Sequence, residues 1–209
     1  MEMCAEDQIN WPYSKVAILV AHPDDETLWA GGLILNHKQT EWTILSLCRK
    51  NDIDRAAKFE KVTRRLGAVG HMGNVDDEPE QTPLCSDELK STILALLPET
   101  RFDLVITHSF VGEYTRHRRH EETARAVYGL WVTEQLKTAE LWMFAYEDGQ
   151  KSYYPKGIKN ADIFIELTDD VWETKYEIIT QIYGFSRNSW EAMTTPRNEA
   201  FWCLQKNQS

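Results

Sequence analysis

Short apolar runs alternate with longer amphipathic segments along most of this chain. The apolar runs predict strands at 16–21, 43–48, 103–107, 141–146 and 162–167. The amphipathic segments predict helices from residue 23 onward and at 53–66, 86–97, 121–136 and 169–183. Unbroken runs such as Val16 to Ala21 are typical of strands buried on both faces of a parallel sheet. The pattern therefore predicts an α/β fold, a Rossmann-like open and mostly parallel sheet with helices on both faces.

Beyond Gly149 the pattern is less regular, and Trp190 and Trp202 are expected to cover an edge of the sheet. Gly31 and Gly32 lie inside the first predicted helix, where glycine allows close packing. No Gly-x-Gly-x-x-Gly motif follows the first strand, which counts against a dinucleotide site. A chain of 209 residues has the length of one domain, so residues 1–209 are expected to form a single domain.

The composition narrows the classes of partner. The chain carries 33 acidic and 23 basic side chains, a net charge of -10 that disfavours nucleic acid and anionic membrane surfaces. No stretch reaches the roughly 20 apolar residues that a membrane helix needs, and residues 1–13 lack the apolar core of a signal peptide. Four scattered cysteines are expected to be reduced rather than to bind metal. We expect a cytoplasmic protein without membrane or nucleic-acid contacts, and a homo-oligomer is left open.

A cluster of polar residues follows the first predicted strand, in the segment Ala21-His22-Pro23-Asp24-Asp25-Glu26. In open α/β sheets, ligands bind beyond the carboxyl ends of the strands. His22 and Asp25 offer a ring nitrogen and a carboxylate oxygen, which are normal ligands of zinc. The carboxylates could equally stabilise a helix start, by about 0.3–1 kcal/mol each, with His22 capping the strand. This segment alone does not separate the two interpretations.

Two histidines, His117 and His120, stand at the start of a later helix and share one of its faces. His120 aligns with the apolar stripe Ala124, Val127 and Trp131, which directs it inward. A lone inward histidine is usually a core residue. Here, however, the His/Asp cluster that follows the first predicted strand makes a role as a metal ligand a second interpretation of His120. Two histidines and one carboxylate form a catalytic metal set that suits zinc or ferrous iron, whereas structural zinc needs a fourth ligand.

With these residues the chain resembles the LmbE-like, or PIG-L, N-acetylglucosaminyl deacetylases. The segment 21–26 is similar to the leading motif of that family, and Gly112-Glu113-Tyr114 followed by His117 and His120 is similar to a second motif that ends in His-x-x-His. Arg55, twelve residues before Gly67, resembles the substrate-contacting arginine of the family. The likeness covers residues 16 to about 130.

The resemblance implies a metal-dependent hydrolase that removes the N-acetyl group of an N-acetylglucosamine-type conjugate and releases acetate and a free amine. Its cofactor would be one divalent ion, Zn²⁺ or alternatively Fe²⁺, held by His22, Asp25 and His120. Asp24 would be the general base and His117 the general acid or oxyanion partner. The small amino-sugar substrate would be contacted by Arg55, Asp76, Asp77 and Tyr114.

The chain departs from the family pattern at two points. Arg118-Arg119 replaces Pro-Asp between the histidines, and Lys58 stands where a glutamate often follows the arginine. One alternative is therefore an amidohydrolase for a non-sugar N-acyl compound whose phosphate or carboxylate is held by Arg116, Arg118 and Arg119. These arginines could instead form a solvated helix start. A non-catalytic sugar or nucleotide binder is the alternative from another class.

Overall fold

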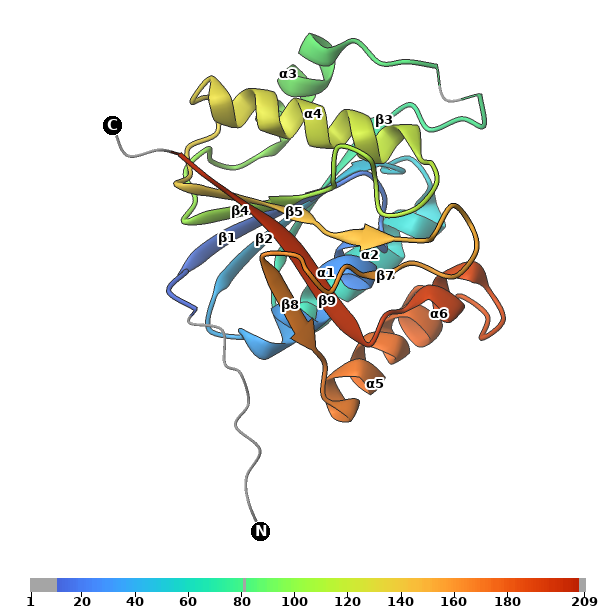
Figure 1. Ribbon diagram of the computed structural model, residues 1–209. Coiled ribbons are helices and arrows are strands. Elements are labelled where there is room, and N and C mark those ends of the chain that lie inside the picture. Colours follow the sequence, from blue (N-terminus) through green and yellow to red (C-terminus); the bar gives the residue numbers. More distant parts are fainter. Residues whose placement is uncertain (1–10, 81, 207–209) are drawn as a thin grey trace.

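The computed structural model of the protein describes residues 11–80 and 82–206. In this part of the chain the core is a seven-stranded sheet in the order β3-β2-β1-β4-β5-β9-β8 (Figure 1). The strands from β3 to β5 are parallel, and β9 is antiparallel to both of its neighbours. The strands are β1 (Lys15–Val20), β2 (Glu41–Cys48), β3 (Val69–Val75), β4 (Leu104–Thr107), β5 (Glu140–Phe144), β8 (Ile163–Glu166) and β9 (Asn198–Gln205), with a separate hairpin of β6 (Tyr146–Glu147) and β7 (Lys156–Gly157).

Helices cover both faces of the sheet, as the sequence predicted (Figure 1). Val16, Ile18 and Val20 of β1 pack into a core shared with α1, α2 and the π-helical turn η1. Ala17 and Leu19, the alternate residues, pack into the core under α3 and α4. The unbroken apolar run arises because both faces are buried. The helical elements are α1 (Asp25–Asn36), α2 (Ile53–Leu66), α3 (Ser86–Leu96), α4 (Arg118–Val132), α5 (Asp169–Glu177), η1 (Ile178–Ile182) and α6 (Trp190–Thr194).

Several local predictions were wrong. The sequence pattern missed β3 and β9, and Trp202 lies within β9, between β5 and β8, rather than over an edge of the sheet. Helix α1 begins at Asp25 and not at Pro23, because Asp24 has a φ of 117°, which is not helical. Helix α4 runs from Arg118 to Val132, about three residues earlier than predicted.

Residues 1–10, which include Cys4, lie outside the described residues. Most of the segment 1–13, which was considered as a signal peptide, therefore lies outside them too. None of the helices within residues 11–80 and 82–206 combines the length and the apolar content that crossing a bilayer requires.

A buried carboxylate from β9 meets the middle of α1. The backbone N–H groups of Gly32 and Leu33 each donate to the Glu199 carboxylate at 2.7 Å, and Lys175 Nζ donates to it at 2.7 Å. A side chain at position 32 would come within 2.3 Å of Leu167, so the close packing expected at Gly32 is confirmed. The hydrogen bonds of Glu199 join α1, which carries Asp25, to β9 and α5.

Replacing Lys175 with methionine is expected to lower the free energy of unfolding by about 3–5 kcal/mol, because Glu199 would remain charged and buried without its cation. Both side chains of this pair are fully buried. Urea unfolding of the purified chain measures the effect. The control is Arg64→Met, which removes an exposed pair with Glu60 and should cost at most about 1 kcal/mol. A Lys175 variant as stable as this control would contradict the prediction.

Candidate metal centre and active site

The candidate site lies where the order of the strands reverses. Strand β1 lies between β2 and β4, and the chain runs outward from it in both directions, which opens a crevice at the carboxyl ends of β1 and β4. His22 follows β1 by two residues, and His108 follows β4 directly. The backbone N–H of Ala21 donates to His108 Nε2 at 2.9 Å and ties the two strand ends together.

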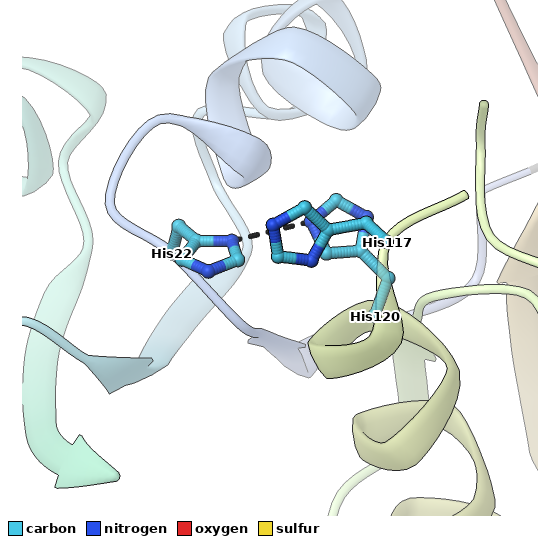
Figure 2. Close-up of side chains that lie close together, drawn as sticks. All are labelled: His22, His117 and His120. Carbon is cyan, nitrogen blue, oxygen red and sulfur yellow. Dashed lines mark hydrogen bonds between the residues drawn. The ribbon is translucent and has the colours of Figure 1, made fainter. Parts of the chain in front are cut away.

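Three side-chain atoms converge in this crevice. His22 Nδ1 lies 3.2 Å from Asp25 Oδ2 and 3.2 Å from His120 Nε2, and the last two atoms are 3.3 Å apart. Ligands about 2.0–2.2 Å from a tetrahedral ion are roughly 3.3–3.6 Å from one another. The three atoms therefore have the spacing of ligands to one ion. Figure 2 shows His22 and His120 facing each other, with His117 beside them.

Neighbouring side chains lie on the far sides of His22 and Asp25 and leave the converging atoms available. Asp77 Oδ1 lies 3.1 Å from His22 Nε2, and in the tautomer that carries its proton on Nε2 the Nδ1 atom keeps a lone pair for an ion. Trp29 Nε1 donates to Asp25 Oδ1 at 3.0 Å and leaves Oδ2 toward the histidines. Such outer partners orient the ligands of many metal sites.

Glu113 contacts Nδ1 of His120 and leaves Nε2 of that histidine directed at His22 and Asp25. Its Oε2 accepts from Nδ1 of His120 at 2.6 Å and from Nδ1 of His108 at 2.9 Å. Burial alone would raise the pKa of Glu113, but the two histidines lower it to about 2, so the group is ionised. The sequence interpretation missed His108, although it follows a strand end just as His22 does. His108 also converges with Asp25 and His120, but both of its nitrogens are engaged in this structure, Nδ1 by Glu113 and Nε2 by the backbone N–H of Ala21.

Asp24 lies beside the three converging atoms and not among them. Its side chain is buried, and Arg55 Nη1 donates to its Oδ2 at 3.3 Å. Burial, together with the neighbouring Asp25, raises the pKa of Asp24 well above its usual value, although Arg55 opposes the shift. A φ of 117° in a non-glycine residue costs roughly 1–3 kcal/mol. This strained turn separates Asp24 from Asp25, so that the two carboxylates face different neighbours.

His117 precedes α4, and the centre of its ring is 4.6 Å from that of His22 and 4.5 Å from that of His120. Burial, followed by the influence of the two other imidazoles, lowers the pKa of His117 to about 3, so the ring is neutral at neutral pH. Tyr114 packs edge-on against Trp190, with ring centres 4.7 Å apart, and stands 6.0 Å from His117.

A pocket of about 390 Å³ opens in front of these side chains. Of the four residues predicted to contact substrate, Arg55, Asp77 and Tyr114 line the pocket, and Asp76 is not among its lining residues. The pocket is lined by His22, Pro23, Asp24, Asp25, Leu28, Arg49, Asp52, Arg55, Asp77, Tyr114, His117, Trp190 and Glu191.

A second pocket, of about 610 Å³, adjoins the first through the shared residues Tyr114 and Trp190. Much of its wall is the segment 148–155, which joins β6 to β7. Thr115 anchors this segment, because its N–H and Oγ1 donate to the Asp148 carboxylate at 2.8 and 2.7 Å. The two pockets therefore belong to one continuous surface.

Two of the three arginines considered for anion binding are engaged in ion pairs. Arg116 donates from Nε and Nη2 to the two carboxylate oxygens of Glu121 at 2.7 and 2.6 Å. The guanidinium of Arg119 is buried and pairs with Asp76 and Glu122. These contacts weaken the case for a phosphate or carboxylate held by this cluster.

Comparison with known proteins decides the family. Residues 17–131, more than half of the chain, match the family described as PIG-L: GlcNAc-PI de-N-acetylase. This chain belongs to the PIG-L family. The PIG-L chain is also 22% identical over 176 residues to the uncharacterized protein L374 of Acanthamoeba polyphaga mimivirus. The aligned region covers 78% of this chain and 75% of that protein.

A deacetylase and a hydratase are among the solved structures that share the fold of this PIG-L chain. The N,N'-diacetylchitobiose deacetylase from Pyrococcus horikoshii has a TM-score of 0.72 at 17% identity, covering 93% of this chain and 85% of that one. The 4-carboxy-2-hydroxymuconate hydratase GalB from Pseudomonas putida has a TM-score of 0.67 at 15% identity, covering 94% and 98%. Because a deacetylase and a hydratase share this fold, the reaction has to be argued from the site.

Proposed function

We propose that this PIG-L chain is a metal-dependent deacetylase that hydrolyses the acetamide of an N-acetylglucosamine-type conjugate, releasing acetate and a free amine. The observation that carries the proposal is the convergence of His22 Nδ1, Asp25 Oδ2 and His120 Nε2 within 3.3 Å of one another at the wall of a pocket. Membership of the PIG-L family supports the reaction and the sugar.

His22, Asp25 and His120 would hold one divalent ion, and a set of two histidines and one carboxylate suits Zn²⁺ as well as Fe²⁺. When bound, such an ion polarises a carbonyl oxygen and makes a water more acidic. Cys48 also lies near His22 and Asp77, but burial raises the pKa of its thiol well above its usual value, so the protonated form is a poor ligand.

Asp24 would act as the general base. It takes a proton from the water that attacks the acetamide carbonyl carbon, and its raised pKa makes the carboxylate a stronger base near neutral pH. The carbon–nitrogen bond then breaks, the proton passes to the amine nitrogen, and acetate leaves. The contact with Arg55 holds the carboxylate in place through the reaction.

His117 would stabilise the oxygen of the same carbonyl group. Its neutral ring can donate one hydrogen bond to that oxygen before negative charge develops there. The developing charge raises the pKa of the imidazole, because an opposite charge favours the protonated form. His117 would then take up the proton that Asp24 removed from the water and pass it to the departing amine.

The rest of the conjugate would extend into the second pocket. Tyr153, Tyr154 and Trp190 line this pocket, and the three residues are 40%, 47% and 38% exposed. Rings with an apolar face and a polar edge suit a sugar, which has apolar faces and hydroxyl edges. The pocket therefore favours a conjugate in which a second ring follows the N-acetylglucosamine.

Replacing Tyr154 with alanine is expected to lower kcat/KM for an N-acetylated disaccharide about three- to tenfold relative to N-acetylglucosamine itself, as the loss of one aromatic contact predicts. Steady-state acetate release from both substrates gives this ratio. Tyr128→Ala is the control, because Tyr128 is an exposed tyrosine of α4 that does not line either pocket. An unchanged ratio in the Tyr154 variant would rule out the second pocket as the place of the second ring.

A substrate panel tests the proposed function as a whole. The purified chain, supplied with Zn²⁺ or Fe²⁺, is incubated with N-acetylglucosamine conjugates and with N-acetyl amino acids, and released acetate is measured. Acetate from the sugar conjugates alone is the expected result. Acetate release from the N-acetyl amino acids alone would be consistent with a hydrolase but would contradict the proposed sugar substrate.

A further inference from the structure

One buried arginine, Arg119, stands between His117 and His120 in the sequence and is not used by the proposed chemistry. The side chain of Arg119 is only 1% exposed. Its Nε donates to the backbone oxygen of Asp76, and its Nη2 donates to Asp76 Oδ2 at 2.9 Å and to the backbone oxygen of Thr82 at 3.0 Å. Arg119 thus ties the start of α4 to the segment that follows β3.

A second contact attaches the same segment to α4. The backbone N–H of Leu84 donates to Glu122 Oε1 at 3.1 Å, and Glu122 Oε2 accepts from Arg119. Residues 76–80 and 82–85 contain no helix or strand, so no backbone ladder fixes them. These side-chain contacts, together with those of Arg49 to Asp77, therefore hold the segment in place.

Asp77, the residue that follows Asp76, reaches the proposed metal centre. Asp77 Oδ1 is 3.1 Å from His22 Nε2, and Asp77 Oδ2 accepts from Arg49 Nη2 at 2.6 Å. Arg49 Nε also donates to Asp77 Oδ2, at 3.0 Å. The Asp77 carboxylate is therefore placed to hold the His22 ring in one orientation.

We propose that Arg119 is a positioning residue for the metal centre. By fixing Asp76, it holds the adjacent Asp77 against His22 and keeps Nδ1 of that histidine directed at Asp25 and His120. The inference rests on the proposed function, because it takes His22 as a ligand. It also gives Arg119 a role that the aspartate of the Pro-Asp pair, which the family pattern has at this place, would not fill, since the long forked side chain of Arg119 donates to two oxygens of Asp76.

Metal affinity tests this role without reference to turnover. The dissociation constant for Zn²⁺ is measured by competition with a chromophoric chelator for the full chain, Arg119→Met, Asp77→Asn and the double variant. Loss of an outer partner of a metal-binding histidine weakens affinity about 10–100-fold, and we expect each single variant to fall in this range. Because both act through one contact, the double variant should bind no more weakly than the weaker single variant.

Independent effects, in which the double variant loses the product of the two factors, would overturn the inference, and so would wild-type affinity in Arg119→Met. Arg125→Met is the control, because Arg125 belongs to the same helix but pairs with Glu121, and its affinity should not change. If Arg119→Met does not fold, Asp76→Ala takes its place in the same cycle and carries the same expectation. Failure of the wild-type chain to bind metal would overturn both this inference and the proposed function, whereas the other outcomes leave the proposed function intact.

Discussion

Replacing Asp24 with asparagine is expected to lower kcat by about 10²–10⁴-fold while the chain still binds one divalent ion. Asparagine has nearly the shape of aspartate but cannot accept a proton from water. The carboxylate of Asp24 contacts Arg55 and is not one of the three converging atoms, so the metal-binding set stays intact. Acetate release and metal content are measured on the same preparation.

The matched control is Asp54→Asn, which makes the same chemical change on α2, where Asp54 is exposed and pairs with Lys58. Its kcat should equal that of the wild type. Full turnover in the Asp24 variant would remove this residue as the base. Loss of both turnover and metal would instead assign Asp24 to the binding of the ion.

The second large effect is expected for His120→Ala, which should lose the bound ion and fall to the background rate of acetate release. The side chain is fully buried, with Nδ1 held by Glu113 and Nε2 directed at His22 and Asp25. A catalytic site with three protein ligands retains only two after this change. Metal analysis after gel filtration measures the loss.

His71→Ala is the comparison, because His71 lies on β3 and does not line the pocket. That variant should keep one ion and wild-type activity. A stoichiometric ion in the His120 variant would exclude His120 as a ligand, and the neighbouring His117, whose ring lies 4.6 Å from that of His22, would be the next candidate.

The interior of the sheet could be predicted from the sequence because its strands are buried on both faces. Strand β1 is apolar from Val16 onward, and its burial is nearly complete. Strand β3 escaped prediction because it is an edge strand in which Val69 is 60% exposed and two glycines interrupt the pattern. Strand β9 escaped because it carries the buried Glu199, whose charge is balanced by a lysine 24 residues away. Tertiary contacts of this kind leave no local pattern.

The candidate site was predictable to the extent that it follows strand ends and shares a helix face. The rule that ligands bind beyond strand ends led to His22 and would also have led to His108, which occupies the same place after β4. The contact between Asp77 and His22 could not be predicted, because it depends on how the segment after β3 is held by Arg119. Residue spacing along the chain carries no information about that contact.

The most direct test of the central claim is acetate release from an N-acetylglucosamine conjugate as metal is returned to the chelator-treated chain. If His22, Asp25 and His120 hold a catalytic ion, the metal-free chain should be inactive and the rate should rise in proportion to bound Zn²⁺ or Fe²⁺ until one ion is bound per chain. The His120→Ala variant should stay at background throughout the titration. Full acetate release by the metal-free chain, or none from any such conjugate with one ion bound, would contradict the account.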